Sequence, residues 1–306
     1  MPLHQSSGRW QLGLALSLLT VLLWGVLPIA LKITLQAIDV YTLTWFRFVL
    51  AFGLLFIYLA ARRKLPSVQQ LPANFGLLAI ATVFLGLNYL LFVQGLAQTS
   101  ANNAEVLIQL APVLFGLGAI AIFKERYTLG QWAGMAVLTL GFALFFHEQL
   151  QSLVTATSNY LIGSFLLIIA AAAWAIYALA QKQLLQSLSS PSIMLTIYGG
   201  CALLFSPFAA PQKILALSPL HLGALLFCGL NTLVAYGAFG EALVHLEASR
   251  VSAVSALCPL CTMVAVEVFS TLMPNLIAPE PLTILGIFGA ILVVSGAMAI
   301  ALARKR

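Results

Sequence analysis

The sequence carries very little charge. Only 7% of its 306 residues are Asp, Glu, Lys or Arg, whereas 62% are hydrophobic, and its mean hydropathy is +1.05. Soluble domains carry about 25% charged residues because their surfaces face water. The shortage of charge excludes a soluble protein and indicates that most of the molecular surface faces lipid.

Residue types that carry catalysis are scarce as well. The chain has four cysteines, all inside apolar runs, and four histidines near the ends of such runs or in loops. Cys258 and Cys261 have the spacing of a redox pair, but no neighbouring cation would favour a thiolate, so we interpret the cysteines as packing residues. The sequence has no glycine-rich phosphate loop and no cluster with metal-ligand spacing. We therefore expect no enzyme, no metal and no cofactor.

Long apolar runs are what the sequence has in abundance. A helix needs about 20 apolar residues to cross a bilayer. Runs of this kind span residues 11–35, 40–61, 72–97, 101–123, 127–146, 160–185, 191–211, 218–244, 248–273 and 281–302. The first run lacks a small-residue cleavage site and is not typical of a removed signal peptide. The pattern predicts an all-α polytopic membrane protein with ten transmembrane helices and no soluble domain.

The basic residues are distributed unevenly. If the ten helices alternate in direction, eleven Lys and Arg residues fall on one side of the membrane and two, Lys32 and Lys213, on the other. Loops rich in Lys and Arg stay in the cytoplasm. Both termini are therefore predicted to be cytoplasmic. The net charge of +6 reflects this topology, and we expect no nucleic-acid partner.

One pattern of residues occurs twice. Residues 101–141 have a diverged copy at 248–296. The matched pairs are Ala101 and Ala248, Pro112 and Pro259, Glu125 and Glu280, Thr128 and Thr283, Gly134 and Gly289, and Gly141 and Gly296. Self-similarity over this length indicates duplication. We divide the chain into repeat 1, residues 11–147, and repeat 2, residues 160–303.

Each repeat holds five of the predicted helices, which is an odd number. The second repeat must therefore enter the membrane from the opposite side. Inverted repeats are the architecture of many secondary transporters, because one fold in two orientations gives inward-open and outward-open states of similar energy. The duplication thus predicts transport by alternating access.

Proline lies near the middle of the fourth and ninth predicted helices. Pro112 and Pro259 each remove a backbone donor and clash with the preceding turn, which bends a helix. Their equivalent positions make them candidate hinges or gates. The alternative is that membrane helices simply tolerate these prolines.

Polar and aromatic side chains gather near the predicted midplane. We expect a substrate-binding cavity lined by Trp24, Asn88, Tyr89, Glu105, Gln109, Trp174, Tyr177, Asn231 and Tyr236. Polar groups facing hydrocarbon are costly, so these side chains should face the bundle interior. Each one taken singly is more typical of a contact between helices than of a substrate contact. Together they suit a small molecule with an apolar side chain and a polar end.

Four charged residues are predicted to lie inside the membrane: Arg47, Glu105, Glu267 and Glu241, the last near the cytoplasmic end of its helix, where it can reach water. An unpaired charge there costs a few kcal/mol or more. We therefore expect Arg47 to pair with one of the glutamates or with free carbonyls at a helix end. Two further roles stay open, namely binding of a substrate carboxylate by Arg47 and proton coupling through Glu105 or Glu267.

Glycines and a short charged turn complete the repeated pattern. Glu125 and Glu280, each three residues before a Thr, are typical of helix starts. Gly134 and Gly141 in one repeat and Gly289 and Gly296 in the other allow close helix packing. Packing between the two halves and packing between two protomers both fit, so a monomer and a homodimer stay open.

The stretches QTSANNAEVLIQLAPV and FKERYTLGQWAGMAVLTLGFAL resemble the EamA-type repeat of the drug/metabolite transporter superfamily. The resemblance covers Trp24-Gly25, Arg47, Pro112, Glu125, Gly134 and Gly141 in the first half, and Trp174, Pro259, Glu280, Gly289 and Gly296 in the second. The second half departs from the pattern at Ile197, which stands where the first has Arg47. The resemblance implies ten helices in inverted five-helix halves and, in many members, export of amino acids or related metabolites.

These observations predict a secondary transporter in the bacterial cytoplasmic (inner) membrane. We expect it to export amino acids, with hydrophobic or aromatic ones favoured, and proton coupling stays open. The expected partners are a small-molecule substrate and the lipid bilayer. Export of drugs or toxic compounds and import are alternatives within transport. A non-transporting membrane scaffold is the alternative from another class.

Overall fold

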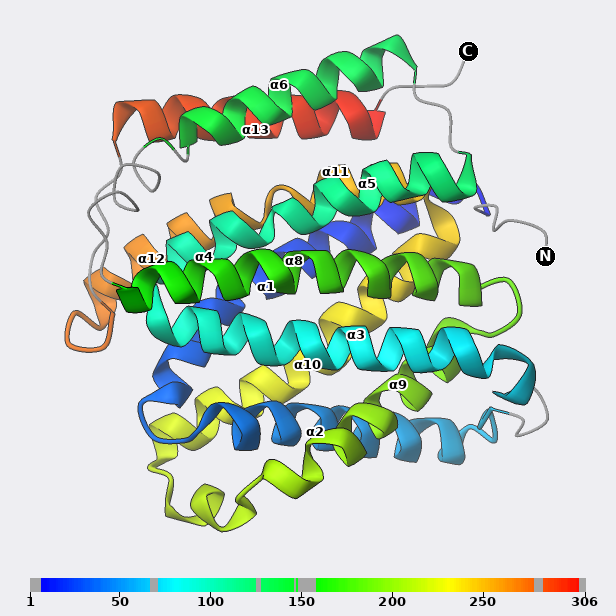
Figure 1. The fold of residues 1–306 in the computed structure, drawn as a ribbon, viewed down its shortest axis with the longest axis vertical. Helices are drawn as coiled ribbons and strands as arrows, with labels where there is room; N and C mark the ends of the chain where they lie inside the picture. The colour runs from blue at the N-terminus through cyan, green and yellow to red at the C-terminus, as the bar shows by residue number, and fades with distance from the viewer. Residues whose placement is uncertain are drawn as a thin grey trace.

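The computed structural model describes residues 7–66, 71–124, 128–145, 147, 158–277 and 283–302. All regular structure in these ranges is helical, and the helices lie side by side in one bundle (Figure 1). The helices are α1 (Trp10–Leu35), α2 (Val40–Ala61), α3 (Leu71–Gln98), α4 (Ala101–Ile108), α5 (Leu110–Phe123), α6 (Leu129–Phe145), α8 (Ser158–Leu184), α9 (Ser190–Phe205), α10 (Pro219–His245), α11 (Ala248–Ser255), α12 (Cys258–Leu272) and α13 (Ile284–Leu302), with short 3-10 helices η2 (Ser206–Phe208) and η3 (Pro211–Ala216).

Seven of the described helical stretches are long and apolar enough to cross a bilayer. They are Trp10–Leu35, Val40–Ala61, Asn74–Gln98, Ser158–Leu184, Ser190–Phe208, Pro219–His245 and Arg250–Leu272. Three shorter helices are apolar as well: Val113–Phe123, Leu129–Leu144 and Ile284–Ile300. The predicted all-α, multi-pass membrane architecture is therefore confirmed, whereas the count of ten crossings stays a prediction.

Two predicted helices are interrupted. The run 101–123 is divided into α4 and α5 at Gln109, and the run 248–273 into α11 and α12 at residues 256 and 257. The backbone N–H that proline lacks would have bonded to the carbonyl four residues earlier. That carbonyl belongs to Ile108 for Pro112 and to Ser255 for Pro259, the last residues of α4 and α11. Each proline thus explains where its helix stops.

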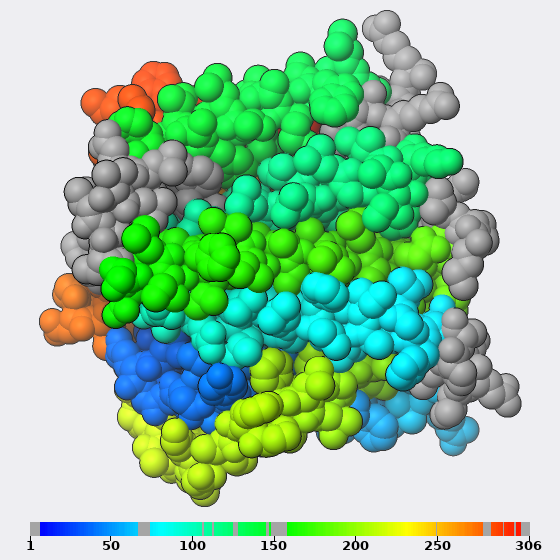
Figure 2. Space-filling model, viewed as in Figure 1, coloured from blue at the N-terminus to red at the C-terminus, as the bar shows by residue number. Residues whose placement is uncertain are grey.

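Helices of the two halves pack against each other throughout the bundle. The main partners are α3 with α8, α1 with α10, α2 with α9, and α6 with α13. Figure 2 shows α6, α5, α8 and α3 as successive rows of side chains on one face. The core that results has its largest buried cluster around the aromatic residues of α1, α3, α8 and α10.

Glycine brings α6 and α13 close together at the edge of the bundle. A Cβ at Gly134 would lie 2.9 Å from the carbonyl oxygen of Gly296, and a Cβ at Gly141 would lie 2.9 Å from that of Gly289. The glycines predicted to allow close packing therefore join the two halves of one chain. Glu125 and Glu280 lie outside the described residues.

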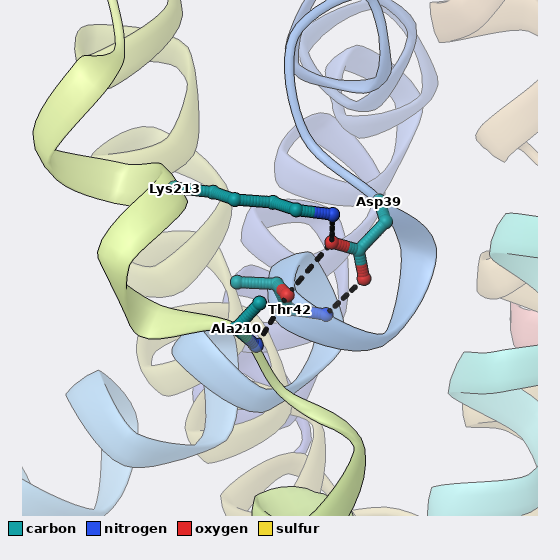
Figure 3. A network of polar contacts seen from close by, with 4 residues as sticks. All are labelled: Asp39, Thr42, Ala210 and Lys213. Atoms are coloured by element: carbon teal, nitrogen blue, oxygen red, sulfur yellow. Dashed lines mark hydrogen bonds and ion pairs between the residues drawn. The ribbon is translucent and has the colours of Figure 1, made fainter.

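A polar network links the turn before α2 to η3 (Figure 3). The Asp39 side chain accepts a hydrogen bond from the Thr42 N–H at 2.9 Å, which caps the start of α2. Lys213 Nζ lies 2.9 Å from Asp39 Oδ2. The Ala210 N–H donates to Thr42 Oγ1 at 2.9 Å. These bonds connect the first half of the chain to the second at one end of the bundle.

Candidate functional site

A cavity lies where both halves of the chain meet. It holds about 600 Å³ of space between atoms, its mouth included. Its lining residues are Trp24, Leu27, Arg47, Asn88, Tyr89, Phe92, Glu105, Ile108, Gln109, Ala111, Trp174, Tyr236, Ser255 and Cys258. The broken helices α4–α5 and α11–α12 both contribute, because each break lies beside the cavity.

The structure brings together seven of the nine residues predicted to line a cavity, and adds Arg47. Tyr177 and Asn231 do not line it. The Tyr177 hydroxyl points to Met194 Sδ on α9, at 3.7 Å. Asn231 Nδ2 donates to the Leu23 carbonyl at 2.6 Å, so this side chain joins α10 to α1. Both residues are buried, and the Tyr177 hydroxyl and the Asn231 amide nitrogen serve contacts between helices.

Aromatic rings form one wall of the cavity. The Trp24 ring centroid lies 5.7 Å from that of Trp174 and 5.0 Å from that of Tyr236, both edge to face. Tyr89 and Tyr236 are 5.4 Å apart. Offset and edge-to-face pairs are the favourable geometries for aromatic rings. The wall is therefore a packed cluster that presents apolar ring surface to any molecule inside.

Arg47 is almost fully buried on α2, with an exposed fraction of 2%. Its Nε donates to Thr232 Oγ1 at 3.0 Å, and its guanidinium carbon lies 4.2 Å from the centroid of the Tyr89 ring. The Thr232 hydroxyl donates its proton to the Cys228 carbonyl at 3.0 Å, which leaves its oxygen free to accept from Arg47. Hydrogen bonding and the cation–π contact hold the guanidinium in place.

Arg47 forms no ion pair with a glutamate of the described residues, which was one of the two kinds of partner predicted for it. Among the described residues, neither Glu105 nor Glu267 lies within 4.0 Å of the guanidinium, and Thr232 and Tyr89 contact it instead. Glu267 is exposed on α12, beside an apolar groove shared with α13. It therefore lies apart from the cavity.

Glu105 lies on α4 with an exposed fraction of 5%. No cationic side chain of the described chain lies within 4.0 Å of its carboxylate. Gln109, one turn further on, is buried, and its Oε1 has no hydrogen-bond partner among the described residues. Asn88 Nδ2 donates to the Ala170 carbonyl at 2.9 Å, which joins α3 to α8. The polar side of the cavity thus has unused capacity for hydrogen bonds.

Several lining residues were not predicted from the sequence. Among them, Ser255 and Cys258 lie 147 residues after Ile108 and Ala111, which also line the cavity. The spacing of the repeat was the signal that could have found them. Small and apolar residues carry no chemical signal of their own, so only this equivalence points to the second member of each pair.

Comparison with known proteins agrees with this architecture. The EamA-like transporter family model matches residues 11–147 and 161–302. The chain is 37% identical over 289 residues to the uncharacterized inner membrane transporter YhbE of Escherichia coli (strain K12), which covers 94% of this chain and 90% of that protein. It is 26% identical to a probable amino-acid metabolite efflux pump of Salmonella typhimurium (strain LT2), over 92% of each chain.

A solved crystal structure shares the fold. It aligns with a TM-score of 0.69 at 16% identity and covers 95% of this chain and 98% of its own. Identity at this level is informative about the fold alone. The family match spans nearly the whole sequence, and YhbE is similar along nearly its whole length. The chain therefore belongs to the EamA-like transporter family.

Proposed function

We propose that this protein is a secondary transporter that exports amino acids, with hydrophobic or aromatic side chains favoured, by alternating access across the bacterial inner membrane. The observation that carries the proposal is the cavity between the halves, which aromatic rings and polar side chains line together. Such cavities suit a small ligand with an apolar body and a polar end. The similarity to a probable amino-acid metabolite efflux pump favours this substrate class.

Alternating access requires two related halves in opposite orientations, and the packing of α6 and α13 supports that arrangement. Gly134 corresponds to Gly289 in the repeat and Gly141 to Gly296, yet Gly134 contacts Gly296 and Gly141 contacts Gly289. This crossed pattern arises when two equivalent helices run antiparallel. The repeat makes α3 equivalent to α10 and α8 equivalent to α1. The contact between α3 and α8 therefore corresponds to the contact between α10 and α1, and both are present. We infer ten crossings in two inverted five-helix repeats.

The orientation in the membrane follows from the basic residues. The first turn of α1 and the last turn of α13 lie at the same end of the bundle (Figure 1). The turns after α2 and α5, with Arg62, Arg63, Lys64 and Lys124, lie at that end too. Loops rich in Lys and Arg remain cytoplasmic. We infer that both termini face the cytoplasm.

The broken helices are the elements that we propose to move. α4–α5 and α11–α12 lie beside the cavity, and each contains a proline just after its break. A short interruption lets the two segments of a membrane helix tilt separately, because fewer backbone hydrogen bonds connect them. Pro112 and Pro259 then act as hinges that open the cavity to one side at a time.

Counterflow in proteoliposomes tests the proposal. Vesicles with purified protein are loaded with one unlabelled amino acid, and uptake of the same labelled amino acid is measured, with and without a pH gradient. We expect saturable uptake for hydrophobic or aromatic amino acids. A pH gradient that drives uptake above the equilibrium level would show proton coupling. No counterflow of any amino acid contradicts the proposed substrate class, and uptake of organic cations instead favours drug export. Absence of all flux favours a membrane scaffold.

A further inference from the structure

A basic side chain, Arg47, and an acidic one, Glu105, line one cavity without pairing with each other. We propose that they are the two poles of a zwitterion-binding site, in which Arg47 binds the α-carboxylate of an amino acid and Glu105 its α-ammonium group. This inference rests on the proposed transport function and names the chemistry by which the same cavity selects its substrate.

The contacts of Arg47 prepare it for a carboxylate. Its hydrogen bond to Thr232 uses Nε, so both terminal nitrogens stay available to a ligand. A guanidinium presents its donors in a rigid plane that matches the two oxygens of a carboxylate. Thr232 and the Tyr89 ring fix the position of that plane. Arg47 can therefore bind a carboxylate without first breaking an ion pair within the protein.

Glu105 provides the complementary pole. Its carboxylate is buried at the cavity with no cation of the described chain beside it, and Gln109 adds an unpartnered amide oxygen one turn away. An ammonium group needs up to three acceptors when it leaves water. Glu105 and Gln109 lie at positions i and i+4 around the end of α4, which places them on one side of the helix. Together they can accept from one ammonium group.

The apolar part of the cavity lining selects the side chain of the ligand. Trp24, Trp174 and Tyr236 present rings, and Leu27 and Phe92 add apolar surface. A zwitterion with an apolar side chain would neutralise both charges and bury its side chain against these rings. A simple amine or a simple acid would leave one buried charge unpaired, which is costly. The site therefore favours α-amino acids over amines and acids of the same shape.

Three probes separate the two poles: L-phenylalanine, phenethylamine, which lacks the carboxylate, and 3-phenylpropanoate, which lacks the ammonium group. Their affinities are measured on detergent-purified full-length protein by competition against tritiated L-phenylalanine or, for variants, by tryptophan fluorescence. In the unmodified protein, both analogues should bind at least about a hundredfold more weakly than phenylalanine, because a buried charge left unpaired costs about 3 kcal/mol or more and each factor of ten is about 1.4 kcal/mol. L-Leucine, isoamylamine and 4-methylpentanoate form a second series if phenylalanine does not bind.

Charge-removing variants then assign each pole. Arg47→Gln should weaken the binding of phenylalanine and of 3-phenylpropanoate and leave the binding of phenethylamine unchanged. Glu105→Gln should weaken the binding of phenylalanine and of phenethylamine and leave the binding of 3-phenylpropanoate unchanged. Glu267→Gln removes a membrane carboxylate outside the cavity and should alter none of the three. If Arg47→Gln is not monodisperse, Arg47→Lys, which keeps the charge and loses the planar fork, should weaken only the two carboxylate ligands.

The outcomes distinguish this inference from the proposed function. Equal binding of all three probes, equal weakening of all three by both variants, or no binding of either amino acid overturns the zwitterion site. Charge-dependent binding without any flux in proteoliposomes supports the site and contradicts transport. Amino-acid flux whose selectivity does not depend on Arg47 or Glu105 supports transport and overturns the site.

Discussion

Trp24 and Trp174, which are separated by 150 residues and come from opposite halves of the chain, meet edge to face with ring centroids 5.7 Å apart. Both rings line the cavity. In the proposed inverted repeat, Trp24 and Trp174 are equivalent residues, so their contact lies on the axis that relates the halves. Any motion that tilts one half against the other must therefore change this contact.

Loss of the Trp174 ring should impair transport. Trp174→Ala removes the ring contacts with Trp24, Phe115 and Phe239. A buried Trp→Ala change lowers the free energy of unfolding by about 3–5 kcal/mol. Trp174→Phe keeps an aromatic ring and should retain most of the flux. We expect amino-acid counterflow to be at least about tenfold slower for the alanine variant. A tenfold lower rate needs an activation free energy that is only about 1.4 kcal/mol higher. Trp10→Ala, at an exposed position, is the control. Unchanged flux in Trp174→Ala would exclude this ring from the mechanism.

A side chain at Gly141 should separate α6 from α13. A Cβ there would lie 2.6 Å from the Val293 backbone nitrogen, so Gly141→Ala forces two helices apart. Overpacking of this kind costs about 1–3 kcal/mol. We expect a lower melting temperature in detergent. Gly53→Ala is the matched control, because a Cβ at Gly53 meets no atom within 4 Å. Equal melting temperatures for both variants would contradict the close approach of these helices.

Replacement of Pro259 should slow the proposed conformational change. In Pro259→Ala the new N–H can bond to the Ser255 carbonyl and connect α11 to α12, since it lies four residues away. We expect a slower rate of counterflow with an unchanged or raised melting temperature, and the same result for Pro112→Ala. Pro207→Ala, in η2, should leave the rate unchanged. A variant at 259 that transports at the normal rate would argue that this proline is only tolerated.

Acid should weaken the link between Asp39 and Lys213. Burial by itself raises the pKa of Asp39, but the Thr42 N–H, Lys213 and the Thr42 hydroxyl together bring it below its ordinary value of 3.8. Because the folded pKa is the lower one, the carboxylate stabilises the fold above about pH 3.8, and this contribution disappears as the pH falls through the folded pKa.

Melting temperatures between pH 7 and pH 3 can check this contribution. Asp39→Asn should melt lower than the unmodified protein at neutral pH, and the difference should shrink toward pH 3. The pair is partly exposed, so the effect is at most about 1 kcal/mol. Lys213→Met should lower the melting temperature less than Asp39→Asn does, because Thr42 still donates a hydrogen bond to Asp39. A difference that stays constant with pH would contradict ionisation of Asp39 as its cause.

Much of the candidate site was predictable from the sequence. The two residues wrongly expected to line the cavity, Tyr177 and Asn231, differ from expectation for one common reason. Helical spacing placed Trp174 and Tyr177 on one face, but a separation of three residues leaves the two side chains about 60° apart around the helix. That angle turns Tyr177 toward Met194 on α9. Asn231 was correctly expected to face inward, yet the Leu23 carbonyl takes its amide. Periodicity shows which face is buried, and not which neighbour each side chain meets.

The composition and spacing of the sequence determined that this is a helical membrane protein with a duplicated pattern, because hydropathy, helix length and repeats are local properties of the chain. The tertiary structure decided which polar groups share a cavity. Arg47 contacts Thr232, 185 residues away, and Glu105 has no cation within 4.0 Å in the part of the chain that the structure describes. Such contacts depend on how each helix is rotated about its axis and on where the breaks at Gln109 and residues 256–257 direct the chain. Packing of the whole bundle sets those rotations, so no single segment encodes them.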